Sequence, residues 1–238
     1  MKSESLWRGE TIGRGDAPIE AMGLCRSFVQ GDSEIHAVRE VSLTVEHGQL
    51  VAVTGPSGSG KSTLLHLLGA LDRPDAGSVR IEGASISELP ERDLALLRRR
   101  RLGFLLQFFS LLPTLTALEN VAFPLLIDRV PNAKEQAEAS LARVGLSHRL
   151  SHRPAQLSGG EQQRVALGRA LVTLPAVVLA DEPTGSLDSA SGRKMLQLLR
   201  QAADAGQAIV IATHDTDAAD YADRVLSLAD GRLEEGER

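Results

Sequence analysis

The stretch Gly55-Pro56-Ser57-Gly58-Ser59-Gly60-Lys61-Ser62-Thr63 decides how this chain folds. It fits the pattern G-x-x-x-x-G-K-[S/T] of a phosphate-binding loop. Residues 49–54 before it are an apolar run of strand length, and residues 64–68 after it are rich in helix formers. The loop therefore has the strand–loop–helix context that the pattern requires, and a chance glycine-rich turn would lack this context.

Each residue type in the loop contributes to holding phosphate. The glycines let backbone N–H groups turn inward around phosphate oxygens, and the following helix adds its positive N-terminal end. Lys61 can reach the β- and γ-phosphates as a point charge, and the Ser62 hydroxyl is placed for Mg²⁺. We therefore expect a nucleoside triphosphate site formed by Gly55, Pro56, Ser57, Gly58, Ser59, Gly60, Lys61, Ser62 and Thr63.

Composition indicates a globular protein with room for one large core. Hydrophobic residues make up 42% and charged residues 24% of the 238 residues. The formal net charge of −5 argues against a surface that binds nucleic acid. Cys25 is the single cysteine, so no intrachain disulfide can form, which suits a reducing compartment. We expect Cys25 to be an inert core residue.

No export signal or membrane span is evident in the sequence. Glu4 and Glu10 interrupt the start of the chain, and no apolar segment of a signal peptide follows them. No run of 18 apolar residues exists, and the most apolar stretch, residues 102–127, is interrupted by polar residues and prolines. We expect residues 1–18 to be a mobile tail and residues 19–238 to form a single domain.

Hydrophobic patterning predicts an α/β fold. Strands are expected at residues 19–28, 41–46, 49–54, 78–83, 102–106, 177–180 and 208–212, and helices at 91–101, 133–144, 158–174 and 193–203. Continuous apolar strands separated by helices indicate a parallel sheet covered on both faces. Residues 224–233 have the chemistry of a β-hairpin. Strand signals fade between residues 108 and 155, where we expect an inserted helical subdomain.

Two clusters of polar residues invite a functional interpretation that we do not favour. Residues 98–101 are four consecutive arginines, and on an acidic chain we expect a solvated helix face rather than a nucleic-acid patch. His148 and His152 are four residues apart, as in some metal sites on helices. No carboxylate or cysteine accompanies them, so we expect no metal there.

An acidic pair supplies what a nucleotide-hydrolysing site needs beyond its loop. Asp181 and Glu182 follow directly after the buried strand expected at residues 177–180. An aspartate at this place can hold Mg²⁺, as in other P-loop enzymes. Glu182 would point towards the γ-phosphate and accept a proton from the attacking water. An ordinary acidic strand end is the alternative, and the phosphate-binding loop elsewhere in the chain makes it less favoured.

The stretch Leu157-Ser158-Gly159-Gly160-Glu161-Gln162-Gln163-Arg164 contains a second candidate anion site. Its Ser158-x-x-Glu161 spacing predicts a capping box that starts a helix. Two adjacent glycines beside a helix N-terminus can also bind an anion. A single chain with two phosphate sites is unusual.

From residue 19 to residue 233 the sequence resembles the ATP-binding cassette (ABC) ATPases, because residues 157–163 are similar to their signature motif. The resemblance implies a P-loop NTPase (RecA-like) core with a mainly parallel sheet, an N-terminal antiparallel β subdomain and an inserted α-helical signature subdomain. It places Gln107 at the Q-loop glutamine, a Mg²⁺ ligand, and His214 at the switch histidine. Phe28 falls near the aromatic residue that stacks on adenine, although many members have tyrosine there.

Membership in this family would make the nucleotide site a shared one. In ABC ATPases two cassettes pack head to tail, and ATP lies between the loop of one and the signature of the other. The resemblance therefore implies that a second copy of this chain contacts ATP through Ser158, Gly159, Gly160, Glu161 and the D-loop residue Asp188. Binding of ATP would favour closure of the dimer, and hydrolysis would release it.

One branch of the family is especially similar, that of the lipoprotein-release and macrolide- or peptide-export ATPases (the LolD and MacB type). The residues that carry this likeness are Ala70-Leu71-Asp72, residues 107–121, Pro154-Ala155-Gln156 and residues 180–185. It implies a cytoplasmic protein, peripheral on the cytoplasmic face of the inner membrane. A transmembrane subunit would dock near Phe108, Phe109, Leu111 and Leu112, although these side chains could instead be core.

Other functions remain open at this point. The family also includes ATPases that drive a membrane protein for signalling or cell division without transport. ABC ATPases that act on DNA need a long coiled-coil insertion, and those that act on ribosomes carry two cassettes, and this sequence has neither. A P-loop kinase of small molecules would need neither the Ser158 motif nor Asp188. We expect no nucleic-acid partner.

Overall fold

The computed structural model describes residues 16–31, 33–107 and 110–236. Most of the expected tail, residues 1–18, lies outside this range, as do Phe108 and Phe109. Pro18, the last residue of that tail, is buried, and its carbonyl accepts a hydrogen bond from the N–H of Glu82 (3.1 Å). The folded body therefore includes Pro18.

A six-stranded sheet forms the centre of the fold, in the order β10-β9-β3-β8-β7-β6. All neighbours pair in parallel except β9 and β10, which form the predicted antiparallel hairpin. The β3 strand, which precedes the phosphate-binding loop, lies between β8 and β9 in the interior of the sheet. The six strands are β3 (Leu50–Thr54), β6 (Leu102–Leu105), β7 (Val177–Asp181), β8 (Ala208–Thr213), β9 (Arg224–Ala229) and β10 (Arg232–Glu235).

Both faces of this sheet are buried, which explains the continuous apolar strands. Successive side chains of a strand point to opposite faces. In β7, Val177 and Leu179 join one core and Val178 and Ala180 join the other. The same alternation runs through β8, so two hydrophobic cores share one sheet, as expected for parallel strands between helical layers.

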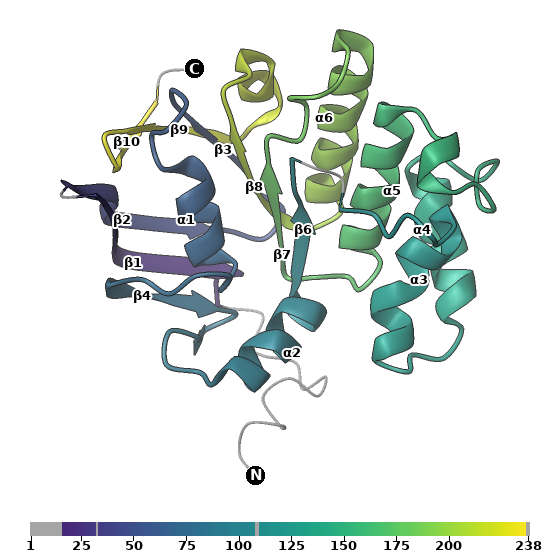
Figure 1. Ribbon diagram of the computed structural model, residues 1–238, viewed down its shortest axis with the longest axis horizontal. Helices are drawn as coiled ribbons and strands as arrows, with labels where there is room; N and C mark the ends of the chain where they lie inside the picture. Colours follow the sequence, from purple (N-terminus) through teal and green to yellow (C-terminus); the bar gives the residue numbers. More distant parts are fainter. Residues whose placement is uncertain (1–15, 32, 108–109, 237–238) are drawn as a thin grey trace.

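An antiparallel sheet covers the first of these cores. Its order is β2-β1-β4-β5, and it confirms the expected antiparallel β subdomain. The helix that follows the phosphate-binding loop, α1 (Lys61–Leu68), contacts both sheets and lies between them (Figure 1). The four strands are β1 (Ile19–Gln30), β2 (Ser33–Val45), β4 (Ala76–Ile81) and β5 (Ala84–Ser85).

Helices cover the opposite face of the central sheet and extend away from it (Figure 1). The α3 helix packs on α4 and α5, and α5 in turn packs on β6 and α6. The remaining elements are α2 (Glu91–Arg101), α3 (Ala117–Ile127), α4 (Ala133–Arg143), η1 (Pro154–Gln156), α5 (Gly159–Leu171), α6 (Ser189–Asp204) and η2 (Thr216–Tyr221). Helices therefore occupy much of the segment where strand signals fade.

The apolar stretch 102–127 is divided between β6, a loop and α3. Among the described residues, no helix is both long and apolar enough to cross a membrane. Leu105, Val121 and Leu125 lie in the core, whereas Phe123 and Leu126 are 42% and 57% exposed.

The expectation for the four arginines at the end of α2 is wrong. All four are half-buried and paired with carboxylates, so they do not form a solvated face. Asp128, after α3, binds both Arg99 and Arg100, while Arg101 pairs with Glu82 at 3.4 Å. Arg98 pairs with Glu91, which lies two turns earlier on the same face of α2. The pairs with Asp128 and Glu82 tie α2 to neighbouring elements.

Asn120 in α3 organises the loop that precedes that helix. It is fully buried, and its amide nitrogen donates to the carbonyls of Leu112 (3.1 Å), Leu115 (3.1 Å) and Thr116 (3.0 Å). Its amide oxygen accepts from the N–H of Leu112 at 2.8 Å. The carbonyls of Leu112 and Thr116 also accept from the N–H groups of Leu115 and Asn120, so the Asn120 side chain adds to the hydrogen bonds that hold this loop.

We predict that Asn120→Ala lowers the free energy of unfolding by about 2–4 kcal/mol, because a fully buried side chain loses all its hydrogen bonds to the loop backbone at once. Urea unfolding measures this change. Gln136→Ala is the matched control, since Gln136 makes a single exposed hydrogen bond to the carbonyl of Pro131. Its effect should stay within about 0.5 kcal/mol. Equal losses for the two variants would contradict the assigned role of Asn120.

Candidate functional site

The phosphate-binding loop lies at the carboxyl end of β3, directly before α1. Gly60 is the N-cap of α1, so the loop ends at the positive end of that helix. The Lys61 ammonium donates to the carbonyls of Gly55 (2.9 Å) and Pro56 (3.0 Å), which curls the side chain back over the loop. Ser59 Oγ is buried and has no hydrogen-bond partner among the described residues. The loop therefore holds a cation and a spare hydroxyl donor, which suits a phosphate ligand.

Two glycines are required here because backbone from other strands presses on the loop. A Cβ at Gly60 would lie 2.0 Å from the carbonyl oxygen of Ala37 in β2, and φ of Gly60 is +104°. A Cβ at Gly55 would lie 2.2 Å from the carbonyl oxygen of Leu228 in β9. Any side chain at either position would displace the loop.

Asp181, at the end of β7, faces the loop. The hydroxyl of Ser62 donates to Asp181 Oδ1 at 3.1 Å. Burial raises the pKa of the Asp181 carboxyl above its ordinary value. A divalent cation beside this carboxylate would offset that effect, and the pair offers the hard oxygen ligands that Mg²⁺ prefers. The residues present therefore fit a Mg²⁺ site.

Glu182 and His214 meet across the ends of β7 and β8. His214 Nδ1 lies 2.9 Å from Glu182 Oε1, and the hydroxyl of Thr213 donates to Glu182 Oε2 at 3.1 Å. The Glu182 side chain is 14% exposed, whereas that of His214 is 64% exposed. Each carboxylate oxygen of Glu182 therefore has a partner, and the histidine is the more accessible of the two groups.

One cavity of about 360 Å³ collects most of the predicted nucleotide-site residues. Loop residues form one side of it, and side chains from other parts of the chain form the rest. Its lining comprises Phe28, Ala37, Ser57, Gly58, Gly60, Lys61, Ser62, Thr63, Gln107, Glu182 and His214. The structure thus brings together residues that are up to 186 positions apart in the sequence, from Phe28 to His214.

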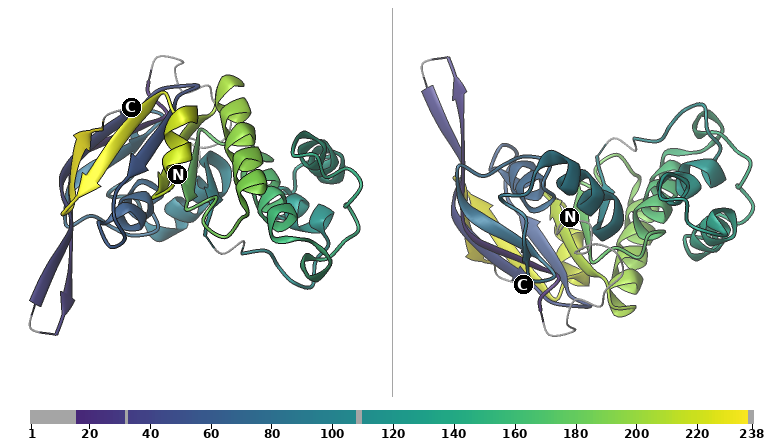
Figure 2. Two further views of the ribbon diagram at one scale, coloured as in Figure 1. Left: turned by 90° about the horizontal axis from the view of Figure 1, so that it is seen from above. Right: turned by 90° about the horizontal axis from the view of Figure 1, so that it is seen from below.

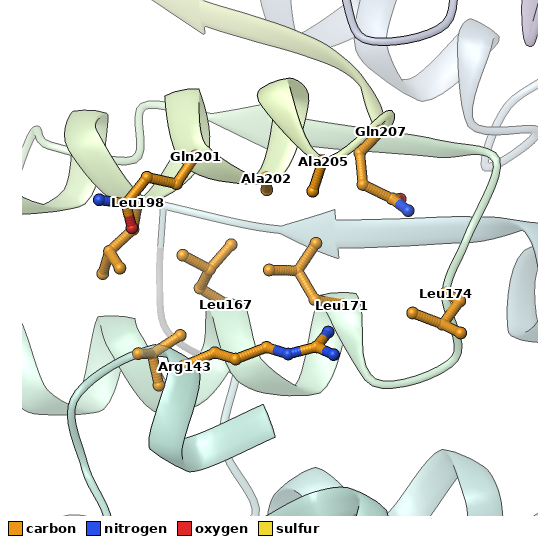
Figure 3. A pocket seen from close by; sticks show the side chains of 10 residues that line it. Arg143, Leu167, Leu171, Leu174, Leu198, Gln201, Ala202, Ala205 and Gln207 are labelled. Atoms are coloured by element: carbon orange, nitrogen blue, oxygen red, sulfur yellow. The ribbon is translucent and has the colours of Figure 1, made fainter. Parts of the chain in front are cut away.

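The predicted signature residues are not part of this cavity. The residues that line it do not include Ser158, Gly159, Gly160, Glu161 or Asp188. A second cavity of about 460 Å³ lies between α4, α5 and α6 and shares no lining residue with the first (Figure 3). Its walls are mainly leucine and alanine, and Arg143 is the one charged residue among those that line it, so it lacks the several charged groups that a magnesium-bound triphosphate requires.

The signature residues form helix caps. The predicted capping box exists: Ser158 Oγ accepts from the N–H of Glu161 (3.3 Å), and Glu161 Oε2 accepts from the N–H of Ser158 (2.9 Å). This bond and the ion pair with Arg149 (2.8 Å) lower the pKa of the Glu161 carboxyl. Ser158 is nevertheless exposed. The cap of α5 is therefore complete within the chain and still lies on the surface of the protein.

Asp188 caps the next helix, α6. Its Oδ1 accepts from the N–H groups of Ala190 and Ser191 (3.0 Å each), and its Oδ2 accepts from the Ser191 hydroxyl (2.7 Å). These bonds, the one from the Ser191 N–H foremost, lower the pKa of Asp188. The Ser191 hydroxyl also lies against Gly160, since a Cβ there would approach its oxygen to 2.9 Å. The signature and Asp188 are therefore neighbours.

Two residues of the site were not predicted from the sequence. Ala37 lines the cavity from β2, and Thr213 holds Glu182, but neither belongs to the motifs that we used. A signal for Thr213 was present, because it directly precedes His214 at the end of an apolar strand. No local pattern marked Ala37, whose contribution depends on how the two sheets pack.

The loop, the acidic pair and the strand order define a P-loop nucleoside triphosphatase. Residues 38–185 match the family described as ABC transporter. The chain is 50% identical to the lipoprotein-releasing system ATP-binding protein LolD of Bordetella avium, over 91% of this chain and 96% of that protein. It is 46% identical to an ABC transporter ATP-binding protein of Thermotoga maritima, over 92% and 95% respectively. The chain belongs to the ABC transporter family, as an ATPase.

Further relatives agree with this assignment. The chain is 44% identical to the macrolide export ATP-binding/permease protein MacB of Vibrio parahaemolyticus, over 92% of this chain but 34% of that protein. It therefore spans about a third of that relative. The dimeric structure of MJ0796, a bacterial ABC transporter cassette, superposes with a TM-score of 0.84 at 39% identity, over 92% of this chain and 98% of that chain. A post-hydrolysis dimer of MJ0796, bound to ADP and Pi, gives a TM-score of 0.85.

We predict that Gly60→Ala weakens ADP binding by about tenfold or more, because the added Cβ meets the Ala37 carbonyl and displaces the loop. Gly145→Ala is the matched control: Gly145 also has a positive φ (+74°), but nothing lies within 4 Å of a Cβ there. The Gly145→Ala change should lower the free energy of unfolding by only about 1 kcal/mol and leave the affinity for ADP unchanged. Calorimetric titration and thermal unfolding measure both quantities. Similar ADP affinities for the two variants would contradict the prediction.

Proposed function

We propose that this chain is the nucleotide-binding subunit of a membrane ABC complex of the export or lipoprotein-release type. Two copies close head to tail around ATP, and closure drives a transmembrane partner. The observation that carries this proposal is the division of the site. The cavity that holds Lys61, Glu182 and His214 contains no signature residue from the same chain.

The loop and its helix bind the triphosphate. Lys61 leaves the carbonyls of Gly55 and Pro56 for the β- and γ-phosphates, and the backbone N–H groups of the loop bind the remaining oxygens. Ser62, Asp181 and Gln107 hold Mg²⁺. When bound, this ion neutralises phosphate charge and orients the γ-phosphate for attack. Phe28 stacks on adenine at the other end of the cavity.

Glu182 acts as the general base for hydrolysis. It accepts a proton from water as the water oxygen attacks the γ-phosphorus and the bond to the β–γ bridging oxygen breaks, which yields ADP and phosphate. One of its oxygens must be free to do so. We propose that His214 turns from Glu182 Oε1 towards the γ-phosphate when ATP binds, while Thr213 keeps hold of Oε2. His214 thereby reports the presence of the γ-phosphate to the base.

The second copy completes the site. Ser158, Gly159, Gly160 and Glu161 of one chain supply the N-terminal end of α5 to the γ-phosphate bound at the other, with Asp188 beside them. Two observations support this proposal. Ser158 is exposed at the N-terminus of α5. The Ser191 hydroxyl, which donates to Asp188, lies against Gly160. The dimeric structure of MJ0796 supports a dimer of this chain.

The segment after Gln107 is the proposed contact with the transmembrane subunit. Leu112 is 38% exposed, while Leu111 is partly buried against the core, and Phe108 and Phe109 lie outside the described residues. The segment begins at a residue of the nucleotide cavity, so it can pass a change at Gln107 to a docked partner. We propose that the chain binds this subunit on the cytoplasmic face of the inner membrane; its relatives are named as an ATP-binding protein of a lipoprotein-releasing system and a macrolide export ATP-binding/permease protein.

We predict that Glu182→Gln binds ATP but hydrolyses it at least about a hundredfold more slowly, since the amide keeps its neighbours and cannot accept a proton. The trapped ATP should shift the chain to a dimer in size-exclusion chromatography. Glu234→Gln, an exposed change on β10, should behave as the wild type. Turnover of Glu182→Gln at the wild-type rate would show that Glu182 is not the base.

The shared site makes a distinct prediction for mixtures of inactive variants. Lys61→Ala destroys the loop of one chain, and Ser158→Arg blocks the signature of the other. A mixed dimer still has one intact loop opposite one intact signature. An equal mixture should therefore recover up to about a quarter of the wild-type ATPase rate, because half of the random dimers are mixed and each has one competent site of two.

Each variant alone should remain inactive in the same phosphate-release assay. A mixture of Lys61→Ala with Lys61→Arg is the matched control, because no dimer in it contains an intact loop. Absence of recovery in the Lys61→Ala and Ser158→Arg mixture, with mixed dimers demonstrated by affinity tags, would overturn the shared site.

A further inference from the structure

Phe28 lies on a part of the molecule that has few packing contacts with the rest of the protein. The β1–β2 ribbon that carries it projects beyond the body of the protein (Figure 2). Phe28 is 41% exposed, and Ile35, its partner across the ribbon, is 46% exposed. Few neighbours can therefore hold the ring in one orientation, although it lines the nucleotide cavity.

Arg26 provides that support. Its guanidinium carbon lies 4.9 Å from the centroid of the Phe28 ring, within the range of a cation–π interaction. Arg26 itself does not line the nucleotide cavity. The guanidinium therefore packs on the ring without occupying the space for nucleotide.

The guanidinium is itself held in place. Its Nη1 binds Asp75 Oδ1 at 2.8 Å, and its Nε and Nη2 contact the two oxygens of Asp72 at 2.9 Å and 3.1 Å. Both aspartates lie in the loop that follows α1, the helix at whose N-terminus the phosphate loop ends. The strand pairing of β1 and β2 also shifts register on either side of Arg26, and such bulges re-aim side chains near active sites.

We propose that Arg26 is a positioning residue for nucleotide binding: it fixes the Phe28 ring and couples it to the helix of the phosphate loop. The chain of contacts runs from α1 through Asp72 and Asp75 to Arg26 and then to Phe28. It sets the separation between the surface for the base and the loop for the phosphates, which one nucleotide must span. The inference rests on the proposed stacking of Phe28 on adenine.

Binding of two ligands tests this role, since ADP uses both ends of the site and pyrophosphate uses only the loop. Arg26→Met should raise the Kd for Mg-ADP about two- to fivefold, the range for loss of an exposed cation–π contact. It should leave the Kd for Mg-pyrophosphate unchanged. Arg26→Lys, which keeps a cation beside both aspartates, should show a smaller loss. Arg80→Met, at an exposed arginine of β4 in the same sheet, is the matched control and should change neither Kd.

A double-variant cycle shows whether Arg26 acts through Phe28. In a Phe28→Leu background, Arg26→Met should weaken ADP binding no further, because the ring that it positions is gone. Additive losses would overturn the proposal, and so would an equal loss of pyrophosphate affinity, which indicates a disturbed loop. Unchanged ADP affinity in Phe28→Leu alone would show that adenine does not stack on Phe28. It would therefore overturn this role of Arg26, but not the assignment of the phosphate site. Thermal unfolding confirms that each variant is folded.

Discussion

The nucleotide site depends on close contact between the phosphate-binding loop and the backbone of two different sheets. Gly55 lies against the carbonyl of Leu228 in the parallel sheet, and Gly60 lies against the carbonyl of Ala37 in the antiparallel sheet. The loop thus packs between the two sheets, and neither Gly55 nor Gly60 has room for a side chain. This constraint gives the antiparallel sheet a direct part in the site, because β2 positions the loop and β1 carries Phe28.

In the proposed dimer, a second chain is needed to complete the nucleotide site. The loop, Glu182 and His214 meet at the carboxyl ends of β3, β7 and β8, where ligands of open α/β sheets bind. Ser158 and Asp188 instead cap α5 and α6 and do not line the cavity. Both caps satisfy their own helices, so these residues are ordered before any second chain arrives. In the proposed dimer, such a preformed surface makes closure depend on ATP and not on prior folding of the signature.

The elements predicted best from the sequence are those whose signals are local. The loop, the acidic strand end at Asp181 and Glu182, the capping box at Ser158 and the hairpin from residue 224 depend on neighbouring residues and are present in the structure. The four arginines were misjudged because their partners, such as Asp128 and Glu82, come from other elements. The α6 helix begins earlier than the predicted residue 193, because Asp188 caps it. The contributions of Ala37 and Arg26 depend on tertiary packing that no local pattern encodes.

The dependence of ATPase activity on protein concentration tests the shared site most directly, because it uses the unaltered chain. If one copy completes the site of another, turnover per chain rises in proportion to chain concentration while monomers predominate, and it levels off once dimers form. Sedimentation velocity under the same conditions identifies the two regimes. Turnover per chain that stays constant across a range in which the protein is demonstrably monomeric would contradict the account.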